Sequence, residues 1–92
     1  MAIAIEFNPS AFKHGISEED IQTAIERFVY NEIMGDDGEK HLLLGFDTHA
    51  NLLEIIYNII DAQTINIFHV MKCRKAYYSL VEEHIRRLLW QE

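Results

Sequence analysis

The stretch His69-Val70-Met71-Lys72-Cys73-Arg74-Lys75 marks the point at which an apolar, strand-like run passes through a basic cluster into a helix-like pattern. Four β-compatible runs lead up to and into it, at about residues 28–35, 40–47, 52–60 and 64–71. Turn-forming residues separate these runs, at 36–39, 48–51 and 61–62. Because the connections are short, the four runs are predicted to form an antiparallel meander.

Helix signals occur on both sides of these runs. Asn8-Pro9-Ser10 predicts a short helix around Phe12, with Asn8 as its cap and Gly15 as its end. Ser17-Glu18-Glu19-Asp20 supplies a cap and three carboxylates for a longer second helix. Apolar residues at helical spacing extend that helix, at Ile21, Ala24, Ile25 and Phe28.

After Cys73 an apolar stripe at helical spacing predicts the final helix, with Tyr77, Leu80, Val81, His84, Ile85, Leu88 and Leu89. His84 is expected to pack within this stripe. The order is two helices, four strands and one helix in a single domain, residues 1–92. This order predicts an α+β fold with the helices on one face of a small four-stranded antiparallel sheet.

Charge is distributed unevenly along this acidic chain, whose net charge is −7. Residues 1–60 hold three basic and eleven acidic side chains, whereas residues 61–92 hold five and four. The net charge argues against indiscriminate nucleic-acid binding, which depends on many Lys and Arg contacts to phosphates. A single cysteine, no signal-peptide pattern and no long apolar window indicate a cytoplasmic protein.

Lys72, Arg74 and Lys75 form a basic cluster at a predicted helix start. A helix start is already electropositive, so three further cations are unfavourable there unless an anion uses the site. Arg74 can form a fork with two phosphate oxygens, and Lys72 and Lys75 can act as point charges. The alternative is a set of solvated charges at a strand–helix junction.

Two histidines are candidates for proton transfer. Strict alternation places His69 on one strand face with Ile65 and Ile67, where it is either a hydrogen-bonded core residue or a catalyst. His14 follows Lys13 at the end of the first predicted helix, where the pair is either a basic helix terminus or part of a phosphate site. A histidine titrates near neutral pH, as RNA cleavage through the 2′-hydroxyl requires.

Other chemistry has weaker support. Glu54 could be a general base, although an edge or solvent-facing carboxylate is the more ordinary reading. The five histidines have neither HxH nor HxxxH spacing and no cysteine pair beside them, so no metal is expected. Phosphate-cradling and dinucleotide glycine patterns are also absent from the sequence, and no cofactor is expected.

Two segments are similar to motifs of one protein family. Phe12-Lys13-His14-Gly15-Ile16-Ser17 and Ile67-Phe68-His69-Val70-Met71-Lys72-Cys73-Arg74-Lys75 resemble motifs of the BrnT-like branch of the RelE superfamily. That family comprises small bacterial ribonuclease toxins that are neutralised by a partner antitoxin. The resemblance implies functional roles for Lys13 and His14, for His69, and for Lys72 and Arg74. Together with the basic cluster, this predicts His14, His69 and Arg74 as catalytic residues and Lys13, Lys72 and Lys75 as phosphate or RNA contacts. The chain differs from such toxins, which are usually basic, in its acidic charge.

Two functions therefore compete. The first is a metal-independent endoribonuclease toxin with RNA as substrate and a small DNA-binding antitoxin as partner. The second is a non-catalytic interaction module, a homodimer or a regulatory partner, whose final helix contributes an apolar strip ending at Trp90. In the second case, Trp90 either anchors an interface or covers the core. Only the first function needs the cluster at residues 72–75 intact.

Overall fold

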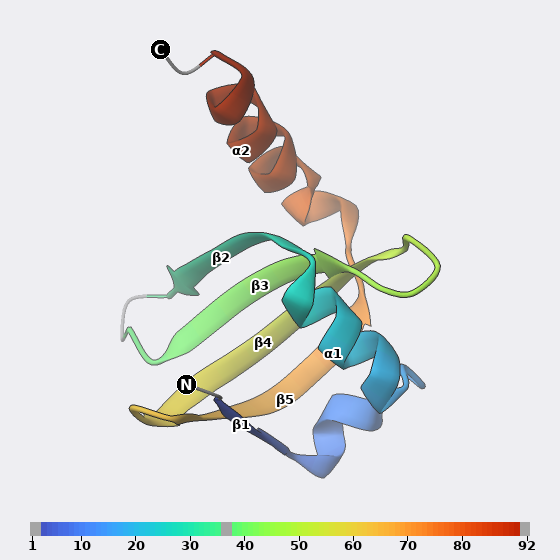
Figure 1. Cartoon of the computed structure of the whole chain (residues 1–92), viewed down its shortest axis with the longest axis vertical. Helices are drawn as coiled ribbons and strands as arrows, with labels where there is room; N and C mark the ends of the chain where they lie inside the picture. The colour runs from blue at the N-terminus through green and yellow to red at the C-terminus, as the bar shows by residue number, and fades with distance from the viewer. Residues whose placement is uncertain (1–2, 36–37, 91–92) are drawn as a thin grey trace.

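The computed structural model describes residues 3–35 and 38–90, which form a five-stranded mixed sheet with the order β1-β5-β4-β3-β2 (Figure 1). The strands are β1 (Ala4–Phe7), β2 (Phe28–Met34), β3 (Lys40–Phe46), β4 (Leu52–Asp61) and β5 (Thr64–Lys72). The helical segments are η1 (Pro9–Phe12), α1 (Glu18–Glu26), η2 (Lys75–Tyr77) and α2 (Tyr78–Trp90). The predicted α+β class and the meander of β2 to β5 are confirmed.

The prediction of four strands is wrong, because the amino-terminal segment adds β1 as a fifth, edge strand. β1 pairs parallel to β5, with Ala4 opposite Thr64 and Phe7 opposite Ile67. Because the two strands are parallel and far apart along the chain, no short turn connects them, and the sequence holds no local signal of their pairing. This pairing places Ala4–Phe7 directly beside β5.

The two predicted amino-terminal helices are shorter than expected. The first is a 3₁₀ turn of four residues, capped as predicted by Asn8, whose side chain accepts the Ser10 N–H at 3.0 Å. α1 is capped by Ser17, as its sequence indicates, but it ends at Glu26 and does not include Phe28. Phe28 instead begins β2, opposite Gly45 of β3, so pairing with the sheet ends the helix.

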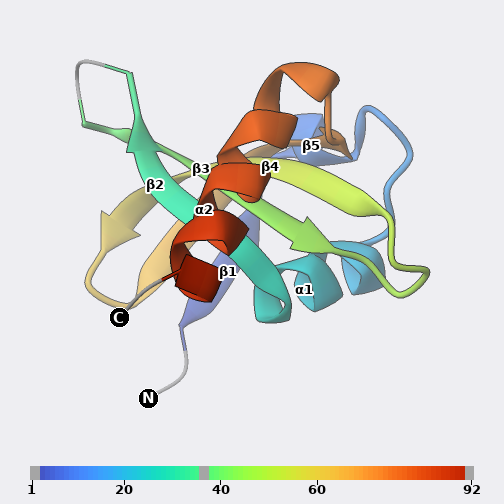
Figure 2. The same cartoon turned by 90° about the horizontal axis from the view of Figure 1, so that it is seen from above.

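The prediction that all helices share one face is wrong, because the sheet has two apolar faces. One core cluster contains Leu43, Leu53 and Ile55 of the sheet beneath Ile21 and Ala24 of α1. A second cluster joins alternate sheet residues to the beginning of α2, through Leu42, Leu44, Cys73 and Val81. Figure 2 shows α1 and the beginning of α2 on opposite sides of the strands. A sheet with apolar residues on both faces needs a cover on each.

Close packing of α1 on β3 depends on Gly45. A Cβ atom at this position would overlap the carbonyl oxygen of Ala24, and Ala24 is itself fully buried. Glycine is therefore required here by the approach of two backbones.

Two of the predicted turn residues, Asp36 and Asp37, lie outside the described residues. Gly38, beside them, has a φ of +69°, as a tight turn requires. The turn after β3 has Ala50 at a φ of +63°. Among the described residues, no helix is both long and apolar enough to cross a membrane.

Candidate active site

A β-bulge in β5 sets the direction of His69. Tyr57 of β4 lies opposite Ile67, whereas Ile56 lies opposite His69, so Phe68 is an extra residue in β5. The prediction that His69 shares a face with Ile65 and Ile67 is wrong, because alternation is interrupted at the bulge. Ile67 remains in the first core cluster, and His69 turns to the opposite face of the sheet.

The amino-terminal segment covers the edge of β5 at this bulge. β1 ends opposite Ile67, and the Ser10 hydroxyl of η1 then donates to the Phe68 carbonyl at 2.6 Å. The chain continues to His14, whose ring lies edge-on to that of His69 with 5.8 Å between the centroids. Two histidines from distant parts of the sequence therefore come together, as a shared site requires.

Glu54 lies beneath His69 and is fully buried, so the expectation of an edge or solvent-facing carboxylate is wrong. Its Oε2 atom is 2.9 Å from His69 Nε2, and its Oε1 atom accepts the Arg74 backbone N–H at 2.9 Å. Burial raises the pKa of Glu54, but the hydrogen bonds from Arg74 and His69 outweigh burial and lower the pKa overall. Glu54 is therefore a carboxylate at neutral pH.

Arg74 turns its guanidinium toward Glu54. Nη2 donates to Oε2 at 2.7 Å, and Nε lies 3.1 Å from both carboxylate oxygens. The hydrogen bonds to Glu54 raise the pKa of Arg74 further, so the side chain stays charged. The Arg74 side chain is 53% exposed, and its Nη1 makes no hydrogen bond within the described residues. One side of the guanidinium thus holds Glu54, and the other side is open to an anion.

None of the three predicted lysines has a carboxylate partner in the described part of the chain. Lys13 is exposed directly before His14, and Lys75 is exposed directly after Arg74. Lys72 is exposed at the end of β5 opposite Leu53, so its register places it on the other face of the sheet from Glu54. Their contacts with phosphate remain predictions.

A second polar cluster lies at the turn after β3. One ligand atom from each of Asp20, Asp47 and His49 lies within 4.8 Å of the others. Asp20 accepts the Thr48 hydroxyl at 2.6 Å, and the buried Asp47 accepts the backbone N–H groups of His49 and Asn51 at 2.8 Å each. These hydrogen bonds fasten the turn to the start of α1, which accounts for both carboxylates.

Cys73 follows β5 directly beside the site, but it is a poor nucleophile. Burial, assisted by the charge of Glu54, raises the pKa of the Cys73 thiol to about 11. The thiolate is the reactive form of cysteine, and a group with this pKa is almost fully protonated at neutral pH. Covalent catalysis through Cys73 is therefore disfavoured.

The charge of Glu54 should make stability depend on pH. We expect Glu54→Gln to lower the free energy of unfolding by about 1–3 kcal/mol at pH 7, because two charge-assisted hydrogen-bond partners lose a carboxylate. A carboxyl group whose folded pKa is depressed stabilises the protein above its unfolded pKa, about 4.3, and this contribution is lost as the pH falls through the folded value.

Urea unfolding of the wild type and Glu54→Gln between pH 3 and 7 measures this effect. The difference between the two proteins should be largest above about pH 5 and should shrink below about pH 4.3. The pKa values of Asp20 and Asp47 are also lowered, but both groups are present in both proteins and their effects cancel. A difference that stays constant over the whole range would contradict the proposed charge on Glu54.

Comparison with known proteins agrees with the architecture. No family model matches the chain, and no curated protein matches it in sequence. The crystal structure of the ribonuclease toxin BrnT of Brucella abortus is similar in fold, with a TM-score of 0.58 and 11% sequence identity. The match covers 80% of this chain and 100% of that chain. The chain therefore has a fold similar to that of BrnT, which confirms at the level of the fold the resemblance seen in the two sequence motifs.

Proposed function

We propose that this protein is a metal-independent endoribonuclease toxin of a type II toxin–antitoxin system. The observation that carries the proposal is the meeting of His14 and His69, 5.8 Å apart between ring centroids, beside the half-exposed Arg74. Two imidazoles, one to accept and one to donate a proton, and a cation with an open side are what cleavage of RNA by its own 2′-hydroxyl needs. The similar fold of a ribonuclease toxin supports this assignment.

Glu54 would set the roles of the two histidines. Because a carboxylate only accepts hydrogen bonds, the proton of neutral His69 is assigned to Nε2, and Nδ1 carries the lone pair. His69 is then the base that takes the proton of the 2′-hydroxyl, and His14 is the acid that protonates the leaving 5′-oxygen. The bond from the 2′-oxygen to phosphorus forms, the bond to the 5′-oxygen breaks, and the products are a 2′,3′-cyclic phosphate and a 5′-hydroxyl.

Arg74 would stabilise the phosphate during this step. One side of its guanidinium holds Glu54, so the open side can donate to a non-bridging phosphate oxygen as negative charge develops there. Glu54 acts as a positioning residue, since it is buried beneath His69 and Arg74 and orients both. Lys13 and Lys75 add positive charge next to His14 and Arg74 and would extend contacts along the RNA backbone.

Cleavage of defined RNA oligonucleotides by the purified protein tests the proposal. We expect His14→Gln and His69→Gln each to lower the cleavage rate by roughly 10²–10⁴-fold, with no effect of a metal chelator on the wild type. His49→Gln, at an exposed histidine in another turn, is the matched control and should cleave normally. Intact RNA after incubation with wild type, or normal cleavage by both variants, would refute the enzyme assignment.

An antitoxin is the partner that this function requires. We expect expression of the protein alone to arrest bacterial growth and co-expression of a small DNA-binding protein from the neighbouring reading frame to relieve the arrest. Harmless expression of the wild type, together with intact messenger RNA, would count against the toxin role.

A further inference from the structure

Helix α2 extends beyond the sheet that supports its first turn (Figure 1). Within the helix as described, only Val81 is buried. The apolar residues that follow are increasingly exposed, with Ile85 at 44%, Leu88 at 61% and Leu89 at 73%. The prediction that His84 packs into a buried stripe is wrong, because His84 is exposed where the helix leaves the sheet. Contiguous exposed apolar residues of this kind mark an interaction site.

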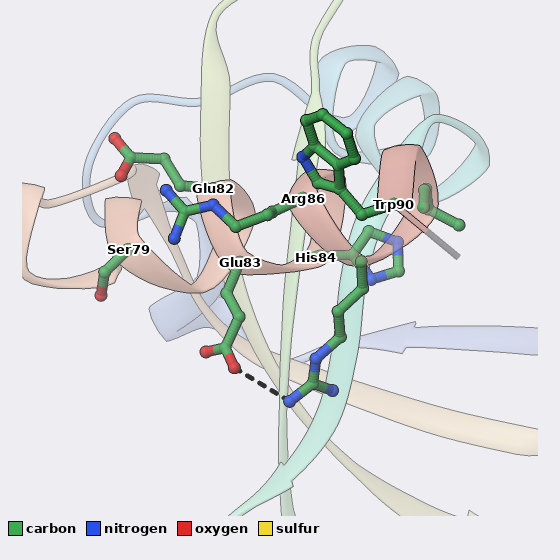
Figure 3. A pocket seen from close by; sticks show the side chains of 8 residues that line it. Ser79, Glu82, Glu83, His84, Arg86 and Trp90 are labelled. Atoms are coloured by element: carbon green, nitrogen blue, oxygen red, sulfur yellow. Dashed lines mark hydrogen bonds and ion pairs between the residues drawn. The ribbon is translucent and has the colours of Figure 1, made fainter. Parts of the chain in front are cut away.

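The exposed apolar residues form one continuous face of the helix. At 3.6 residues per turn, Val81, Ile85 and Leu88 fall in one row, and Leu89 lies beside them. Trp90, although 79% exposed, does not end this strip or cover the core. Figure 3 shows Trp90 among the polar side chains, which include Glu83 and Arg86.

Of the two Glu–Arg pairs spaced four residues apart on α2, one forms an ion pair within the helix and the other does not. Glu83 and Arg87, on the side away from Ile85 and Leu88, form an ion pair of 2.9 Å, drawn as a dashed line in Figure 3. Glu82 and Arg86 have the same spacing and flank the exposed apolar face, yet neither forms an ion pair with any described residue. The flanking pair is therefore free to meet charges on another molecule.

We propose that α2 binds α2 of a second copy of this chain, antiparallel and related by a two-fold axis. Glu82 and Arg86 lie one turn apart on the same flank, so this arrangement places Glu82 of each copy next to Arg86 of the other. A parallel pair would instead turn this flank of one copy toward the opposite flank of the other, so Glu82 and Arg86 would not meet across the interface. In the antiparallel pair, the order Glu82, Arg86 on one helix meets the order Arg86, Glu82 on the other. This charge complementarity favours a second copy of the chain as the molecule that covers the exposed apolar face.

The area available sets the strength of the pairing. A helix of 13 residues is about 20 Å long, and a single helix pair buries less than the roughly 1,200 Å² of a standard stable interface. The dimer should therefore form reversibly, with a dissociation constant in the micromolar range, on the order of 1–100 µM. The proposed dimer uses the exposed part of α2 and neither His14 nor His69, so the dimer proposal does not depend on ribonuclease activity.

Sedimentation velocity on the full chain from about 1 to 300 µM tests the dimer, bracketing the expected dissociation constant. Glu82→Arg and Arg86→Glu should each weaken association at least tenfold, because like charges then meet across the axis. An equimolar mixture of the two variants should restore a dimer, and so should the double variant Glu82→Arg/Arg86→Glu. The control Glu83→Arg, which changes the far side of the helix, should associate like wild type.

The apolar face has its own pair of variants. Leu88→Asp should leave only monomer, whereas Ile60→Asp, at an exposed apolar residue of β4, should not change association. Circular dichroism confirms that each variant is folded. A monomeric wild type at the highest concentration, or a dimer that Leu88→Asp and both charge variants leave unchanged, would overturn the proposal. Sedimentation measures the mass of the protein and not RNA cleavage. A failed dimer proposal can therefore be told apart from a failed ribonuclease assignment.

Discussion

Gly45→Ala is expected to destabilise the protein by about 3 kcal/mol, because the added methyl group would overlap the carbonyl oxygen of Ala24. The atom it meets belongs to the backbone of α1, so it cannot move aside by changing a rotamer. α1 must shift away from β3 and give up part of the packing of Ile21 and Ala24, both fully buried. For a chain of this length the total stability is only about 5–14 kcal/mol.

Thermal unfolding followed by circular dichroism measures this loss, and the midpoint should fall by roughly 12–24 °C. Gly15→Ala is the matched control: Gly15 has a φ of +78°, but no described heavy atom lies within 4 Å of an added Cβ. Its left-handed conformation should make the substitution unfavourable by only about 1–2 kcal/mol. Equal losses in the two variants would show that contact between α1 and β3 at Gly45 is not the cause.

On the proposed ribonuclease function, Arg74→Ala is expected to lower RNA cleavage by roughly 10²–10³-fold and to relieve growth arrest, because the phosphate would lose the guanidinium donor assigned to it. The variant also leaves the buried Glu54 with only His69 and the backbone N–H of residue 74 as hydrogen-bond partners, so a disturbed Glu54 is a second route to the same loss. Arg74→Lys separates these effects: it keeps a positive charge near Glu54 but cannot form the guanidinium fork.

Rates measured with saturating RNA, beside unfolding midpoints, distinguish the two roles of Arg74. If Arg74 stabilises the transition state, Arg74→Lys should unfold near the wild-type temperature and still cleave slowly. If Arg74 only positions Glu54, then Arg74→Lys should cleave nearly as fast as wild type. A folded Arg74→Ala protein with undiminished cleavage would remove Arg74 from the catalytic machinery.

The four strands of the meander could be predicted from sequence because their evidence is local. Turn residues separate the runs, and the observed strands begin and end within one residue of the predicted ranges. The caps Asn8 and Ser17 were also recognisable, since a capping side chain binds a backbone group only two or three residues away. β1 could not be found in this way, because its partner strand lies near the other end of the chain.

The candidate site was predictable in its residues but not in its geometry. The basic cluster and the two histidines stand out by residue type, and the structure brings His14, His69 and Arg74 to one place. Glu54 was a weak candidate because a single acidic residue in an apolar strand has no local pattern that reveals its partners. Its burial depends on the β4–β5 register, which places it near His69 and Arg74.

Local sequence patterns are sufficient to predict the α+β class, the strands of the meander, the caps and the amphipathic final helix, because each depends on residues a few positions apart. Tertiary structure alone decided the edge position of β1, the bulge that turns His69 over, the contact between Gly45 and α1, and how far α2 extends from the sheet. These features depend on register and on contacts between distant segments, which residue spacing along the chain does not encode.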